Sequence, residues 1–159
     1  MNDAWFLNDP IIDCRSIVKP GTIIGGTGFG YTKVDGKWLP KNHNYTVIIE
    51  KDVHIGSLCT IDRGRWRDTV IREGTRIDNG VHVGHNAIIG KNCIIGAHAV
   101  IGGSAELGDG AEVWVNAFVH QGVKVGRNTI IGACSYLRHD TGDNELWYGC
   151  PAKKIRDLK

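Results

Sequence analysis

The stretch at residues 77–90, IDNGVHVGHNAIIG, repeats a six-residue unit, and this period constrains the fold more than any other feature of the chain. Aliphatic residues recur at Ile77, Val83 and Ile89, and a small residue or valine stands two places before each of them. A period of six fits neither the 3.6 residues per turn of an α-helix nor the simple alternation of a single strand. It is typical of coils built from short strands joined by corners.

The same period covers most of the chain, with one insertion of four residues before Ile71. The other aliphatic positions in register are Ile49, Ile55, Ile61, Ile95, Ile101, Leu107, Val113, Val119, Val125, Ile131 and Leu137. We therefore predict an all-β chain that forms a parallel β-helix, a single domain over residues 1–159. Three units make one coil, so residues 18 apart lie above one another, about 4.8 Å apart as neighbouring strands are.

Three segments leave the period: a loop at residues 25–45, a loop at residues 62–70 and a short C-terminal tail at residues 138–159. Long loops on a compact repeat body tend to be functional. The aromatic residues of the first loop are expected to contact a substrate or to clasp a neighbouring subunit. We expect this loop to pack near a His85, and we favour the His85 of a neighbouring subunit.

The composition and charge of the chain limit the classes of function that it can have. The net charge is +2, which does not point to nucleic acid. The sequence contains no signal peptide and no apolar run long enough to span a membrane, so we expect a cytoplasmic protein. Of the five cysteines, Cys59 and Cys93 occupy the inward small position and are expected to be buried thiols.

Counting by coils places one set of residues in a column at a single corner. The column contains Arg63, His85, Gly103, Gln121 and His139, and His120 precedes it by one position in its own coil. The loop at residues 62–70, with its acidic residue, leaves from the coil below His85. Glycine in the column would let a ligand approach the backbone.

Outward positions of the coils carry an excess of apolar side chains. Examples are Ile88, Ile94, Val100, Trp114, Phe118 and Ile130. Exposed apolar rows of this size usually mark an interface. Three prisms packed around a three-fold axis would cover them, and His85 would then face a cleft between two subunits.

Five short motifs resemble those of a known family, in the same order and at similar spacing. They are GGTGFGY (25–31), TIDRG (60–64), DTVI (68–71), IDN (77–79) and GHN (84–86). The set resembles the UDP-3-O-acylglucosamine N-acyltransferases of lipid A synthesis over roughly residues 25–125. The resemblance implies a left-handed coil, a homotrimer, and His85 as general base.

Some family features have no counterpart in these 159 residues, namely the N-terminal uridine-binding domain and the C-terminal helices for acyl-carrier protein. The family's second histidine falls near Gly122, two places from His120. The ending GCPAKKIR (149–156) resembles smaller hexapeptide acetyltransferases, whose sugar-nucleotide N-acetyltransferase members have a histidine placed as in residues 83–90. Both resemblances imply acyl transfer to the amine of a nucleotide-linked amino sugar. The donor stays open between acetyl-CoA or another acyl-CoA, which the ending favours, and acyl-carrier protein, and no permanent cofactor is expected.

The residue types suit this chemistry. An amine that attacks a thioester must lose a proton, and imidazole titrates near neutral pH. His85 is the expected base, and Asp68 is the expected carboxylate on its other ring nitrogen. The backbone N–H of Gly103 is the expected donor to the oxyanion.

The remaining candidates concern the two substrates. The phosphates of the donor are assigned to Lys153, Lys154 and Arg156. The acceptor is assigned to Phe29, Tyr31, Asn79 and His120.

Two other classes of protein compete with this interpretation. A zinc enzyme like the γ-class carbonic anhydrases needs three imidazoles, two of them five residues apart, and no pair of the seven histidines has that spacing. We therefore expect no metal. A non-catalytic hexapeptide-repeat subunit that only assembles with partners is the other alternative.

Overall fold

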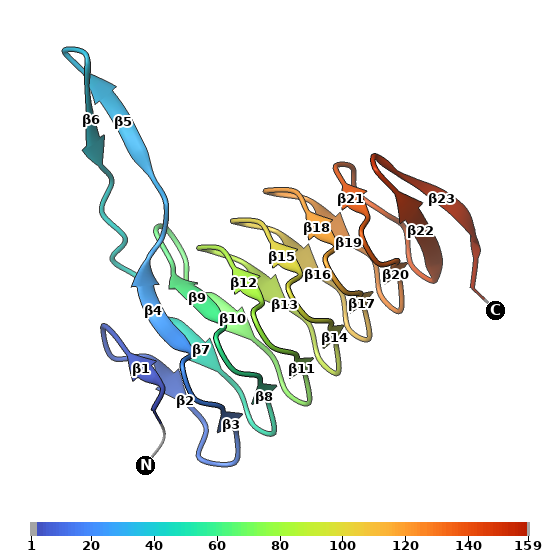
Figure 1. Ribbon diagram of the computed structural model, residues 1–159, viewed down its shortest axis with the longest axis horizontal. Helices are drawn as coiled ribbons and strands as arrows, with labels where there is room; N and C mark the ends of the chain where they lie inside the picture. Colours follow the sequence, from blue (N-terminus) through green and yellow to red (C-terminus); the bar gives the residue numbers. More distant parts are fainter. Residues whose placement is uncertain (1–2, 159) are drawn as a thin grey trace.

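The computed structural model describes residues 3–158, which wind into a three-sided prism of parallel strands (Figure 1). The first side contains β1 (Trp5–Phe6), β4 (Ile23–Thr27), β9 (Thr60–Arg63), β12 (His82–Val83), β15 (Val100–Ile101), β18 (Phe118–Val119) and β21 (Tyr136–Leu137). The second contains β2 (Ile11–Ile12), β7 (Val47–Ile49), β10 (Thr69–Ile71), β13 (Ile88–Ile89), β16 (Glu106–Leu107) and β19 (Lys124–Val125).

The third side contains β3 (Ile17–Val18), β8 (His54–Ile55), β11 (Arg76–Ile77), β14 (Ile94–Ile95), β17 (Glu112–Val113), β20 (Ile130–Ile131), β22 (Glu145–Gly149) and β23 (Ala152–Asp157). Within each side most strands pair with register steps of 18 residues, or 22 across the insertion, as in Val83 with Ile101 and with Ile61. The step is 37 residues across the first loop, as in Ile23 with Thr60, and 16 residues between β20 and β22. The predicted parallel β-helix is confirmed. Residues 3–158 contain no helix, and therefore none that could span a membrane.

The core is a stack of the periodic aliphatic residues, which are almost all fully buried. The small position two places earlier is buried as well, because it lies where the chain turns a corner of a narrow prism. Cys59 and Cys93 occupy it with no exposed surface, and burial raises the pKa of the Cys93 thiol to about 11. The prediction of two buried thiols is confirmed.

The first loop contains a two-stranded antiparallel hairpin, β5 (Tyr31–Val34) and β6 (Lys37–Pro40), which projects away from the prism (Figure 1). The second loop is short and connects β9 to β10. The C-terminal segment leaves the six-residue period as expected, but it is not a free tail. β22 adds to the third side beside β20, and β23 folds back antiparallel to β22 at the end of the prism.

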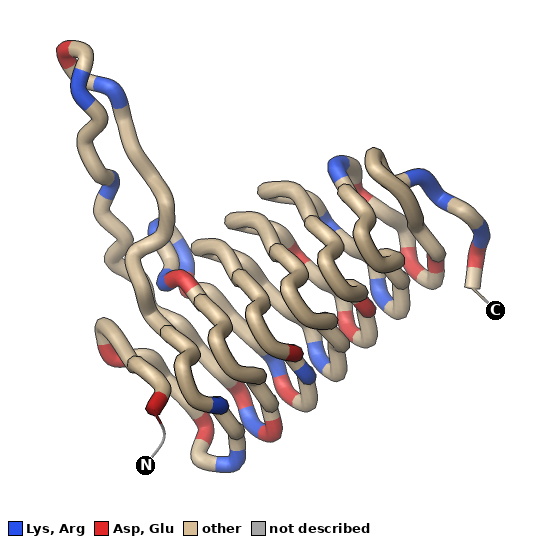
Figure 2. Tube along the Cα trace, viewed as in Figure 1, with Lys and Arg blue, Asp and Glu red and all other residues tan. Residues whose placement is uncertain are grey.

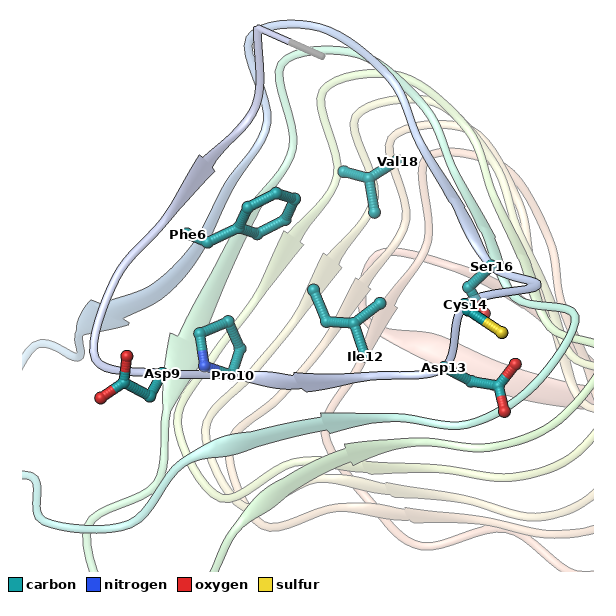
Figure 3. Close-up of a pocket in the computed structure, with 8 residues that line it drawn as sticks. All are labelled: Phe6, Asp9, Pro10, Ile12, Asp13, Cys14, Ser16 and Val18. Carbon is teal, nitrogen blue, oxygen red and sulfur yellow. The ribbon is translucent and has the colours of Figure 1, made fainter. Parts of the chain in front are cut away.

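The N-terminal end of the prism is open (Figure 3). A hollow of about 520 Å³ lies there within the first coil, and Figure 3 shows Phe6, Ile12 and Val18 around its interior. This hollow is the exposed end of the core. It holds no imidazole and belongs to the coil of β1 to β3, whereas His85 lies between β12 and β13.

Candidate active site

The candidate site is centred on His85, at the corner between β12 and β13. The predicted stacking of Gly103 over this residue is confirmed, since a Cβ added at Gly103 would lie 3.0 Å from Nε2 of His85. The backbone N–H of the next residue, Ser104, donates to the carbonyl oxygen of His85 at 2.8 Å. Because Gly103 has no side chain, no Cβ crowds Nε2 of His85 from this position.

The tautomer of His85 follows from its neighbour Asn86. Nδ1 of His85 lies 2.7 Å from Oδ1 of Asn86, and Nδ2 of the same amide donates to the carbonyl oxygen of Arg67 at 2.7 Å. Because a carbonyl oxygen can only accept, the amide orientation is determined, and Oδ1 faces the imidazole. Nδ1 therefore carries a proton, and Nε2 of the neutral ring is free to accept one.

The expected contact between Asp68 and His85 is wrong. Oδ1 of Asp68 accepts the backbone N–H of Thr46 at 2.9 Å and so joins the two loops at their bases. The DTVI segment turns back into β10 at this point, which directs the carboxylate toward the first loop. The group on Nδ1 of His85 is the neutral amide of Asn86.

The base of the first loop packs directly on His85, within the same chain. A Cβ added at Gly28 would lie 2.9 Å from Cβ of His85 and 3.0 Å from Nε2 of His43. The rings of His43 and His85 meet edge to face, with centroids 5.2 Å apart. The expectation that this loop packs near a His85 is confirmed for its base, which contacts the His85 of its own chain and not that of the neighbour that was favoured, while its hairpin tip projects outward (Figure 1).

His43 was not predicted from the sequence. Its side chain is fully buried, Nδ1 lies 2.9 Å from the carbonyl oxygen of Lys41, and Nε2 has no hydrogen-bond partner among residues 3–158. Burial lowers the pKa of His43, so the ring is neutral at physiological pH. The residue lies outside the six-residue register, so periodicity could not have placed it.

Asp62, in the TIDRG motif, is the second residue that was missed. Its side chain is only 16% exposed, and burial raises the pKa of the carboxyl, while the imidazoles of His82, His85 and His43 act in the opposite direction when they are protonated. Oδ2 of Asp62 lies 3.8 Å from Nε2 of His82, whose Nδ1 lies 2.7 Å from Oγ1 of Thr60. A half-buried carboxyl among three imidazoles is typical of functional sites.

The second loop covers another side of His85. The rings of Trp66 and His85 meet edge to face with centroids 5.7 Å apart, and the Arg65 guanidinium lies 5.6 Å from the Trp66 ring. Arg67 donates from Nε to the carbonyl oxygen of Asn86 and pairs with Glu106 at 2.8 Å. Figure 2 shows these arginines as the blue segment beside the base of the hairpin.

Two of the expected acceptor residues, Phe29 and Tyr31, lie immediately beyond Gly28. Their rings pack edge to face at 5.1 Å, and with Trp38 they line a hollow of about 550 Å³ on the hairpin. Phe29 is 86% exposed. An exposed aromatic surface thus begins one residue after Gly28, the residue that packs on His85.

The other two expected acceptor residues lie apart from His85 within one chain. Asn79 is at the preceding corner, between β11 and β12, where its Oδ1 accepts the Ser57 N–H at 2.8 Å. His120 lies on the same edge as His85, two coils further on, with Nδ1 3.1 Å from the Tyr136 hydroxyl.

The three basic residues expected to bind the donor's phosphates lie on β23, at the C-terminal end (Figure 1). Lys154 forms two ion pairs, since its Nζ lies 2.7 Å from carboxylate oxygens of both Glu145 and Asp157. Hydrogen bonds to these carboxylates raise the pKa of the lysine. Lys153 and Arg156 are exposed. No group of three His, Cys, Asp or Glu side chains in residues 3–158 is placed to hold a metal ion.

Comparison with known proteins supports the fold. The bacterial transferase hexapeptide repeat matches residues 68–103 and 104–139. The UDP-3-O-acylglucosamine N-acyltransferase of Methylorubrum extorquens is 38% identical over 150 residues, which are 94% of this chain and 43% of the relative. A relative of the same name from Nitrobacter winogradskyi is 49% identical over 69 residues, 43% of this chain and 20% of that protein.

Among solved structures, a UDP-N-acetylglucosamine acyltransferase from Bacteroides fragilis superposes with a TM-score of 0.86 at 26% identity, covering 99% of this chain and 60% of that one. The chain spans less than half the length of the curated relatives that it matches. The chain thus combines hexapeptide repeats with a β-helix fold, and 94% of its length is similar to part of a UDP-3-O-acylglucosamine N-acyltransferase.

Proposed function

We propose that the protein is an N-acyltransferase, which moves an acyl group from a thioester donor to the amine of a nucleotide-linked amino sugar. The observation that carries this proposal is the state of His85. Its Nδ1 proton is held by Asn86, which leaves Nε2 as the acceptor nitrogen beside Gly103, where no side chain crowds it. The names of the similar proteins support the reaction type.

In the proposed mechanism, Nε2 of His85 removes a proton from the amine as its nitrogen attacks the thioester carbon. The oxyanion that forms needs an N–H donor, and no acceptor in residues 3–158 pairs with the Gly103 N–H, which supports that group for this role. The C–S bond then breaks, and the imidazolium returns its proton to the leaving thiolate. Such a base typically contributes roughly 10²–10⁴ in rate.

Acceptor and donor are assigned to opposite parts of the same edge. Phe29 and Tyr31, close to His85, offer faces on which a base or sugar ring can stack. On the other side of the corner the edge continues through His120 toward β23, where the exposed charges of Lys153 and Arg156 are available to phosphates. The donor is an acyl-CoA or an acyl-carrier protein.

We propose a homotrimer with left-handed coils, as the family resemblance implies. The exposed apolar side chains on the faces of the prism support such an assembly, among them Ile94, Trp114 and Phe118, which are 37–42% exposed in the single chain. Asn79, at the preceding corner, would approach the acceptor only from a neighbouring subunit. Light scattering at micromolar concentration tests the assembly, and a stable folded monomer would contradict it.

The experiment that tests the function is an acyl-transfer assay with UDP-3-O-acylglucosamine and a set of acyl-CoA and acyl-carrier-protein donors. His85→Ala should reduce kcat by roughly 10²–10⁴. His120→Ala serves as the comparison on the same edge and should have a milder effect. Activity of His85→Ala within about threefold of the parent protein, a difference too small for a lost base, would overturn the proposal.

A further inference from the structure

The His85 corner holds three hydrogen-bond acceptors that are short of donors. In the neutral form of His85, Nε2 is the acceptor nitrogen, because Nδ1 carries the ring proton. The same holds for neutral His43, whose Nδ1 donates to a carbonyl oxygen and whose Nε2 is buried without a partner in the described chain. The third acceptor is the Asp62 carboxylate, since the register of β9 with β12 places Asp62 beside Gly84, the residue before His85.

Asp62 occupies an open position between two glycines. It is opposite Gly26 in the pairing of β4 with β9, and Gly84 follows β12, the next strand on the other side. A Cβ added at Gly26 would still be 3.8 Å from Oδ1 of Asp62. No N–H or O–H within residues 3–158 donates to this carboxylate, and the 3.8 Å to Nε2 of His82 exceeds hydrogen-bond length.

A partly buried carboxylate without a donor is costly unless a ligand satisfies it. A primary ammonium group matches this set of acceptors, because it carries three N–H donors and a positive charge. A hydroxyl group offers one donor and no charge. The corner is therefore built for a cationic amine rather than for a neutral alcohol.

We propose that Asp62 is a further catalytic residue, which binds the acceptor amine as its ammonium ion in front of His85 and selects an amine over a hydroxyl acceptor. This inference rests on the proposed N-acyltransferase function. It assigns His43 a supporting part, as the neutral ring that packs on Gly28 beside His85 and adds no positive charge of its own near Asp62.

The reaction balances with this assignment. The bound ammonium first releases one proton to water, which gives the nucleophilic amine. The amine nitrogen forms the C–N bond with the thioester carbon while Nε2 of His85 takes a second proton, the C–S bond breaks, and the thiolate receives that proton from His85. The products are the amide, the free thiol and one proton in solution. Asp62 keeps its charge throughout, next to the nitrogen that begins as a cation.

The test compares the binding of two probes in the absence of donor, by calorimetry at pH 7. One probe is UDP-3-O-acylglucosamine, and the other is UDP-3-O-acylglucose, which has a hydroxyl group in place of the amine. The parent protein should bind the amine at least tenfold more tightly, whereas Asp62→Asn should bind both about equally. Asp109→Asn is the matched control at another corner, where Oδ1 accepts the Lys91 N–H at 2.8 Å, and it should keep the full preference.

Each result of this experiment either supports the inference about Asp62 or overturns it. An amine preference that survives in folded Asp62→Asn would overturn the inference, and so would a parent protein that binds both probes equally, which does not depend on any variant. If the parent binds neither probe, the proposed acceptor fails together with the inference. If both probes bind equally while transfer still depends on His85, the inference alone fails.

Discussion

Oδ1 of Asn86 lies 2.7 Å from Nδ1 of His85, and the backbone of Asn86 turns the corner with a φ of 64°. One residue thus turns the chain and holds the imidazole in the tautomer whose Nε2 is free. The left-handed conformation is one that asparagine tolerates better than most residues. The first prediction follows from this double role.

Asn86→Gly should keep the corner, because glycine accepts a positive φ. It should remove the partner of His85 together with the hydrogen bond from Nδ2 of Asn86 to the Arg67 carbonyl oxygen. A neutral hydrogen bond contributes about 0.5–1.5 kcal/mol, so kcat should fall about two- to tenfold. Asn92→Gly is the matched control, since Asn92 has a φ of 52° at a corner without a catalytic candidate. Equal losses of kcat in the two variants would show that the effect is only structural.

Gly103→Ala should reduce activity without unfolding the protein. The new Cβ would lie 3.0 Å from Nε2 and 3.1 Å from Cε1 of His85, in the space where the amine must approach. The φ of Gly103 is outside the left-handed region, so alanine fits the backbone there. We expect a fall of about tenfold or more in kcat/KM, equivalent to about 1.4 kcal/mol of transition-state binding. Steady-state kinetics together with a melting curve would check this, and unchanged kcat/KM would contradict it.

His43→Phe should make stability less sensitive to acid. Burial holds the pKa of His43 in the folded state below its ordinary value of 6.5, so the unfolded chain binds more protons as the pH falls through 6.5. Protonation of this residue therefore favours unfolding on the acid side, and phenylalanine removes that contribution while keeping a ring of similar size. Urea unfolding at pH 7.5, 6 and 5 measures the free energy of unfolding. The value for the variant should increase relative to that of the parent protein as the pH falls. A constant difference would argue against a buried neutral His43.

Asp62→Asn should raise the melting temperature at pH 8 even though it is expected to impair amine binding. Burial raises the pKa of this carboxyl, so its charged form is disfavoured in the folded state at any pH above the folded pKa. The gain should be a few degrees if it amounts to about 1 kcal/mol, since that energy shifts Tm by roughly 2–4 °C at this chain length. At pH values below about 3.8 the carboxyl is protonated in both states, and the gain should vanish. A lower Tm at pH 8 would contradict the prediction.

The sequence by itself determined the prism and the column at its corner. A strict six-residue period leaves one choice of which residues face inward, because a slip by one residue would expose the whole aliphatic stack. The register of the coils then follows from counting residues, so the position of Gly103 over His85 could be predicted from the sequence alone. The same rule placed Cys59 and Cys93 in the core.

Only the tertiary structure decided what surrounds His85. Asp68, Asn86 and His43 lie in loops or corners, where no period governs side-chain direction. The position of Asp68 depends on a contact with Thr46, 22 residues away, and that of His43 on a loop that leaves and rejoins the prism between β4 and β7. Asp62 lies in register, but its unusual pKa arises from burial and from three imidazoles brought together by separate elements. The repeat fixes the backbone by local periodicity, whereas the site is made of contacts between segments distant in sequence, which only the folded chain specifies.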